Sequence, residues 1–116
     1  MEFDWSEDDA RHRAEIRAFL DEVLPDDWAE ISKDGPGGDA QAAFSRRFCG
    51  WMAERGWLTQ HWPAEYGVRD ASPWRHAVVG EEMWAIGEPR GAQYMNVNWI
   101  GPAIICLLYT SDAADE

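Results

Sequence analysis

The sequence predicts an all-α domain of four helices, and three observations support that prediction. Apolar residues recur at helical spacing in successive segments of the chain. Residues that favour the starts and stops of helices, among them Ser6, Pro25, Gly56 and Ser72, stand at the ends of those segments. The 116 residues are 46% hydrophobic and include eight tryptophans, which is enough for one compact core and too apolar for a disordered acidic chain.

The first helix is expected at about residues 7–24. Ser6 suits the N-cap, and Asp9 stands three residues later in the capping-box position. Pro25 ends the segment because the residue before a proline is pushed out of helical geometry. The apolar stripe has the spacing i, i+3, i+4, i+7, i+8 and consists of Ile16, Phe19, Leu20, Val23 and Leu24.

A second helix is expected at about residues 39–55, ending at Gly56. Its aromatic stripe, which includes Phe44, Phe48 and Trp51, is interpreted as core packing at helical spacing. Residues 26–39 before it are expected to form a loop. Glycines at 35, 37 and 38 could cradle a phosphate, but Asp39 and the acidic surroundings favour a plain linker.

The connection at residues 56–67 is apolar and rigid where a loop is usually polar. It carries Trp57, Trp62 and Tyr66, with Pro63 restricting the backbone. We expect it to pack against the helices. A third helix should follow from Ser72-Pro73 to about residue 86, with Val78, Val79, Met83 and Ile86 inward.

Adjacent glutamates stand on this third helix. Glu81 and Glu82 point about 100° apart, so they cannot share a proton as a catalytic pair. We expect one to be half-buried and hydrogen-bonded and the other to be solvated. After a turn at residues 87–91, a fourth helix begins at Gln93 and is interrupted near Gly101-Pro102. Its mixture of amides and aromatics fits a buried helix or one that lines a cavity.

Charge and motif content exclude several classes of function. The formal charge of −12 argues against binding nucleic acid or anionic membrane surfaces. No apolar run reaches the ~20 residues of a membrane span, and residues 1–20 lack a signal-peptide pattern. Two cysteines suggest no disulfide framework, so a cytoplasmic location is expected. His12, His61 and His76 lack ligand partners at metal-site spacing and are interpreted as surface or packing residues.

The motifs nevertheless follow an order found in a known family. They are the opening Phe3…Ser6-Glu7, Phe19-Leu20…Pro25, Gly56-Trp57-Leu58, Trp62-Pro63-x-Glu65-Tyr66-Gly67, Glu81-Glu82-Met83 and Asn98-Trp99-Ile100-Gly101-Pro102. Each is weak alone, but the ordered set resembles the N-terminal helical domain of acyl-CoA dehydrogenases. The resemblance covers nearly all of residues 2–105.

The resemblance implies an FAD-dependent parent enzyme that desaturates an acyl-CoA thioester between its α and β carbons. The catalytic base and the flavin site of the family lie in later domains, so no catalytic or FAD-binding residue is expected here. The N-terminal domain supplies walls of the acyl pocket. By position, the expected substrate-binding residues are Gln93, Tyr94, Asn96, Val97 and Asn98. The implied partners are the acyl-CoA substrate, further copies in a dimer or tetramer, and an electron-transfer flavoprotein.

The last eleven residues, 106–116, resemble a translated sequencing-library adapter. Their sequence abandons the helical pattern that precedes it and reads Cys-Leu-Leu-Tyr-Thr-Ser-Asp-Ala-Ala-Asp-Glu. We therefore expect residues 1–105 to be an N-terminal domain that is incomplete at its C-terminal end, and residues 106–116 to be a non-native tail. Cys49, the cysteine outside that tail, lies in an apolar helical stripe and is interpreted as a core residue.

Two alternatives stay open at this point. A flavin oxidase or monooxygenase of the same fold would have the same N-terminal helices, and the oxygen reactivity of its reduced flavin would identify it. A free-standing acidic helical interaction module would have a reading frame that ends near residue 116. Sequencing the gene past codon 105 separates that module from either kind of enzyme.

Overall fold

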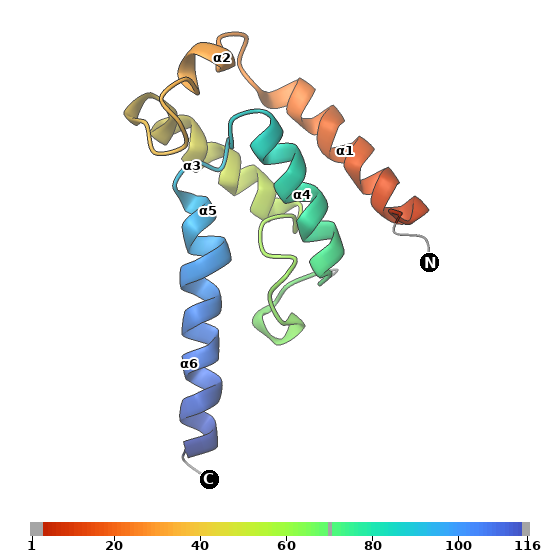
Figure 1. The fold of residues 1–116 in the computed structure, drawn as a ribbon, viewed down its shortest axis with the longest axis vertical. Coiled ribbons are helices and arrows are strands. Elements are labelled where there is room, and N and C mark those ends of the chain that lie inside the picture. The colour runs from red at the N-terminus through yellow and green to blue at the C-terminus, as the bar shows by residue number, and fades with distance from the viewer. Residues whose placement is uncertain (1–3, 70, 115–116) are drawn as a thin grey trace.

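The computed structural model describes residues 4–69 and 71–114, and within them every regular element is helical (Figure 1). The predicted all-α class is therefore confirmed. The four expected helical segments are present, the last of them divided by a π-helical turn, and two short elements lie between them. In chain order the elements are α1 (Glu7–Val23), α2 (Trp28–Ile31), α3 (Asp39–Glu54), the 3-10 helix η1 (Ala64–Tyr66), α4 (Pro73–Ala85), α5 (Gln93–Met95), the π-helix η2 (Asn96–Ile100) and α6 (Gly101–Ala114).

The helix ends lie within one residue of the predicted ones because local caps define them. The Ser6 hydroxyl accepts the backbone N–H of Asp9 at 3.1 Å and caps α1. The Ser72 hydroxyl accepts the N–H of Arg75 at 3.3 Å and caps α4, with Pro73 at the first helical position. Gly56, with φ of +72°, follows α3 in the left-handed conformation that terminates helices.

The linker at residues 26–39 is not a plain loop as predicted, because it contains α2. Trp28 begins this helix, and its side chain is only 8% exposed. The indole ring packs on Phe44 with centroids 5.3 Å apart, and its Nε1–H donates to the Ile86 carbonyl at 2.6 Å. Burial of this one side chain against α3 and the end of α4 stabilises the helical turn that begins at Trp28. The helix propensity of this short acidic segment did not predict that turn.

The core lies between α1, α3 and α4. Ile16, Phe48, Met52 and Val78 are completely buried there. Full burial of one such side chain contributes roughly 1.5–3 kcal/mol, so this apolar cluster is the main stabilising element of the chain. Val23, Leu24, Trp51 and Ile86, which were also predicted inward, are only partly buried against this cluster. The cluster itself consists of Ile16, Phe19, Leu20, Trp28, Phe44, Phe48, Met52, Val78, Val79 and Met83.

The two adjacent glutamates of α4 separate as predicted. Glu82 is 7% exposed and accepts hydrogen bonds from Arg13 at 2.6 Å and from Arg17 at 3.0 and 3.1 Å. The side chain of Glu81 is 56% exposed and accepts a hydrogen bond from Arg13 Nη2 at 2.6 Å. The hydrogen bonds from Arg17 and, to a smaller extent, from Arg13 lower the pKa of Glu82. The ionised carboxylate on α4 therefore links this helix to α1.

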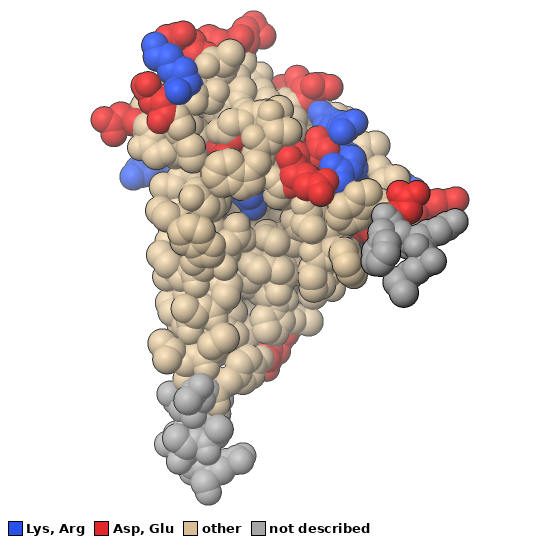
Figure 2. Space-filling model, viewed as in Figure 1, with Lys and Arg blue, Asp and Glu red and all other residues tan. Residues whose placement is uncertain are grey.

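The last helical segment leaves the core and extends as an arm, which is α5, η2 and α6 together (Figure 1). Charged residues gather toward the opposite part of the molecule in Figure 2, and the part of the arm that is not drawn in grey shows no charged side chain in that view. No helix in residues 4–69 and 71–114 is long and apolar enough to cross a membrane. Helix α6 continues through residues 106–114, and an adapter origin for these residues stays a prediction.

Candidate functional site

The predicted interruption near Gly101-Pro102 takes the form of the π-helical turn η2. The Gly101 N–H bonds to the carbonyl of Asn96, five residues back, instead of to Val97, four residues back. Val97 would then need the N–H of residue 102, but Pro102 has none. The Val97 carbonyl is thus left without a backbone donor inside its own helix.

Two side chains from the 56–67 loop satisfy this carbonyl. The Trp62 Nε1–H donates to Val97 O at 2.8 Å, and His61 Nε2 donates to the same oxygen at 2.9 Å. We call these three residues the Val97 clamp. The Trp62 ring approaches the helix so closely that a Cβ on Gly101 would lie 2.3 Å from its Cζ2 atom, so only glycine fits at residue 101. The part of the loop that carries Trp57 and Trp62 is therefore packed down as predicted, whereas Tyr66 is 41% exposed.

A histidine stack backs this clamp. The rings of His61 and His76 lie with centroids 3.7 Å apart and 22° between their planes. His76 Nε2 donates to the Asn98 amide oxygen at 2.8 Å, and both Nδ1 atoms are buried without a hydrogen-bond partner. Burial lowers the pKa of both imidazoles, and the neighbouring His61 and Arg90 help bring the pKa of His76 to about 4. Both rings are therefore neutral at pH 7, and the packing interpretation holds for them.

The five residues predicted to line a pocket do not share one face. Asn96 is exposed, and its amide donates to Gln93 Oε1 at 2.7 Å. Val97 is buried, and Asn98 is half-buried against His76. The structure therefore brings Gln93 and Asn96 together at the outside of the segment and turns Val97 and Asn98 toward the 56–67 loop and α4.

Tyr94, the remaining predicted residue, belongs to an aromatic row. Its ring meets Trp84 edge-on with centroids 5.0 Å apart, and Trp99 edge-on with centroids 5.6 Å apart. Trp84 and Trp99 are 51% and 60% exposed. Such a row offers apolar contact surface of fixed geometry to a ligand or to another protein segment.

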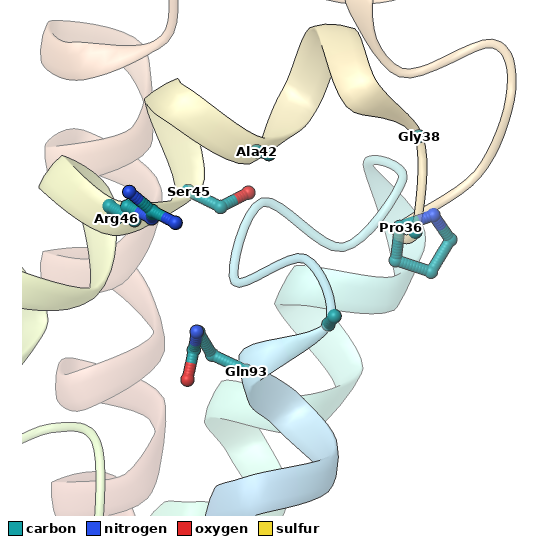
Figure 3. Close-up of a pocket in the computed structure, with 8 residues that line it drawn as sticks. Pro36, Gly38, Ala42, Ser45, Arg46 and Gln93 are labelled. Atoms are coloured by element: carbon teal, nitrogen blue, oxygen red, sulfur yellow. The ribbon is translucent and has the colours of Figure 1, made fainter.

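Gln93 also lines a small pocket between the glycine-rich loop, α3 and the start of α5 (Figure 3). Its volume is about 130 Å³, and a second pocket beside α1 has about 110 Å³. Sites for drug-sized ligands usually measure roughly 300–1,000 Å³, so neither of these pockets fits a dinucleotide such as FAD. The walls of the first are Pro36, Gly37, Gly38, Ala42, Ser45, Arg46, Ala92 and Gln93.

The turn before α5 hides a charged pair that sequence reasoning missed. Glu88 and Arg90 are 0% and 1% exposed and are joined by two bonds of 2.7 and 2.8 Å. Gln41 donates to the Glu88 carbonyl at 2.6 Å, which fixes the turn against α3. The sequence signal was two opposite charges inside the Gly87–Gly91 segment, which was predicted only as a turn.

Chemistry beyond packing is sparse in the described part of the chain. No group of three or more His, Cys, Asp or Glu side chains that could hold a metal ion occurs in it. Cys49 is 8% exposed, and burial raises the pKa of its thiol to about 11, as expected for a core residue rather than a nucleophile. His12 is 5% exposed and packs edge-on against Trp57.

Comparison with known protein families gives a match that covers most of the chain. The family model described as "Acyl-CoA dehydrogenase, N-terminal domain" matches residues 6–114. No curated protein and no solved structure matches. The matched region contains the capped helices, the packed 56–67 loop and the π turn described above. On this evidence the chain belongs to the acyl-CoA dehydrogenase N-terminal domain family.

Proposed function

We propose that this chain is the helical N-terminal part of an FAD-dependent acyl-CoA dehydrogenase and forms a wall of its acyl pocket. The family match over residues 6–114 is the observation that carries the proposal. The reaction is the α,β-desaturation of an acyl-CoA thioester, and the parent protein is a cytoplasmic dimer or tetramer that passes electrons to an electron-transfer flavoprotein. In this proposal FAD binds in later domains of the parent enzyme, as the resemblance implies.

The wall is the segment from Gln93 to Asn98. Three features support this role: the aromatic row around Tyr94 is open, Asn96 is exposed, and the π turn gives the segment a fixed irregular shape. π-Helical turns are frequent at functional sites. Tyr94, Gln93 and Asn96 would face the acyl chain or its surroundings, while Val97 and Asn98 would define the wall from behind.

The test uses the complete open reading frame, read from the gene through and beyond codon 105. The purified protein should contain FAD and reduce an electron acceptor with acyl-CoA. Tyr94→Ala and Asn96→Leu should change the ratio of kcat/KM between short and long acyl chains by roughly tenfold, since one methylene in an apolar pocket is worth ~1–3 kcal/mol.

Trp74→Ala is the control for these variants, since Trp74 is 69% exposed on α4 and lies outside the segment. A gene that stops at residue 116 would refute the enzyme proposal. An active flavoenzyme whose chain-length preference is the same in wild type, Tyr94→Ala and Asn96→Leu would refute the wall.

A further inference from the structure

We propose that His61 and Trp62 are positioning residues: by occupying the Val97 carbonyl they select the π-helical register of η2 and so fix which side chains the wall segment presents. The consequence for substrate choice rests on the proposed function, whereas the register itself does not. The backbone and two side chains compete for one acceptor oxygen. The Trp62 indole and the His61 imidazole occupy this oxygen, and in an α register the Gly101 backbone N–H would be its donor.

In an ordinary α-helix the Gly101 N–H would bond to Val97 O, four residues back. Here it bonds to Asn96 O, and the two side chains bond to Val97 O at 2.8 and 2.9 Å. A carbonyl oxygen has two lone pairs, so an α register would displace at least one of the two side-chain donors from Val97. It would leave a half-buried indole N–H or a half-buried imidazole unpaired, at a cost of roughly 1–3 kcal/mol. The clamp thus favours the π register over the α register.

The residues Gly101 and Pro102 lower the cost of forming the π register at this turn. Pro102 cannot donate to any carbonyl, so the helix loses no backbone bond at that residue when the register changes. Gly101 leaves space for the Trp62 ring, because an added Cβ would lie 2.3 and 2.7 Å from two ring carbons. The pair Gly101-Pro102 permits the π turn, and His61-Trp62 selects it.

The register decides the direction of the side chains in the wall. Removing the extra residue of a π turn rotates one flank of the helix by about 100° relative to the other. The Asn98 amide, now held by His76 at 2.8 Å, would then leave its partner. The aromatic contact between Tyr94 and Trp99, which spans the turn at 5.6 Å, would also separate. Residues of the loop therefore determine the shape of a surface that they do not themselves form.

The experiment measures the register directly in the 116-residue chain. In ¹⁵N,¹³C-labelled protein, the coupling across the hydrogen bond from the Gly101 amide identifies its acceptor carbonyl. We expect Asn96 as acceptor in the wild type and in the control Trp74→Phe, an exposed indole outside the clamp. We expect Val97 as acceptor in the double variant His61→Phe/Trp62→Phe. A folded double variant whose Gly101 amide still couples to Asn96 would overturn the proposal.

A second variant covers the case in which the double variant fails to fold. Gly101→Ala keeps both donors but displaces the Trp62 ring, so its own amide at residue 101 should also move to the Val97 carbonyl. Retention of the Asn96 acceptor in Gly101→Ala, together with a Trp62 indole resonance that has shifted because the ring is displaced, would contradict the selection by Trp62.

In the complete enzyme, the double variant should change the chain-length preference through KM while FAD content stays at the wild-type level. If Tyr94→Ala and Asn96→Leu alter the preference and the clamp variant does not, the positioning role is wrong. If none of the three alters it, the wall proposal fails, while the coupling measurement still decides the register.

Discussion

The core and the arm of this molecule are held in place by different forces. In the core, α1, α3 and α4 bury a continuous apolar cluster, and ion pairs at Glu82 only join its edge. The arm leaves most of its large apolar side chains exposed. Its attachments include two hydrogen bonds at the Val97 carbonyl, one at the Asn98 amide and the edge-on contact of Tyr94 with Trp84. The exposed members are Met95, Trp99, Ile100, Ile104, Leu107, Leu108 and Tyr109. Stability should therefore be set by the core, and the shape of the surface by a few hydrogen bonds.

The largest expected difference in stability is between truncating a buried aromatic side chain in the core and truncating an exposed one in the arm. Phe48→Ala removes a ring that is 0% exposed and contacts both Phe19 and Phe44, so it should lower the free energy of unfolding by about 3–5 kcal/mol. Trp99→Ala removes a larger ring that is 60% exposed, and its effect should stay below about 1 kcal/mol. Urea denaturation followed by circular dichroism measures both. Equal losses would mean that the arm is part of the cooperative core.

A second contrast tests whether the polar edge of the core depends on burial. Glu82→Gln removes the charge that two arginines share at 10% side-chain exposure, and should cost about 2–3 kcal/mol. Arg17 stays 65% exposed and can return to water, which keeps the cost at that lower level. Glu81→Gln, at 56% exposure, is the matched control and should change stability by less than about 0.5 kcal/mol. A similar cost for both variants would show that the geometry at Glu82 adds nothing.

The core could be predicted from the sequence because its determinants are local. Ser6, Ser72 and Gly56 specify helix ends through contacts with residues three or four positions away, and the apolar period specifies the inward faces. The short helix α2 escaped prediction because its cause, the burial of Trp28 against Phe44 and Ile86, depends on residues far along the chain.

The sequence could predict which segment holds the candidate site, but not the contacts that shape it. The Gly101-Pro102 pair indicated an interruption, but not that Trp62 and His61 would satisfy the carbonyl left free at Val97. Sequence position grouped Val97 with Asn96, although one is buried and the other exposed. The register of a π turn rotates the side chains that follow it, and a single sequence analysed with ordinary helical periodicity cannot show that.

Acidification should affect the two regions in different pH ranges. An unfolded histidine has a pKa near 6.5, whereas the pKa of His76 in the folded state is about 4. Between these two pH values the unfolded state binds a proton at this residue and the folded state does not. Stability should fall by about 2 kcal/mol between pH 6.5 and 4, and this loss comes from the attachment of the arm. The lowered pKa of Glu82 gives a loss only below its ordinary value of 4.5.

Urea titrations at pH 7, 6, 5 and 4 measure this slope. His76→Phe keeps an aromatic ring beside His61 but cannot take a proton, so its stability should fall less steeply over the same range. His61 and His12 also have lowered pKa values and should leave a residual slope in the variant. Identical slopes in variant and wild type would contradict the assignment to His76.

The smallest effect compares two exposed hydrogen bonds of the same sequence spacing. Ser6 accepts the Asp9 N–H at 3.1 Å, and Asn96 donates to Gln93 at 2.7 Å, both across three residues. Ser6→Ala should nevertheless cost about 1 kcal/mol, because it leaves a backbone N–H of α1 without its cap. Asn96→Ala should cost less than about 0.5 kcal/mol, because both freed side-chain groups return to water and alanine favours the helix. Thermal unfolding of the two variants decides the order, and a larger loss for Asn96→Ala would mean that this exposed pair, rather than the Val97 clamp alone, holds the wall segment in shape.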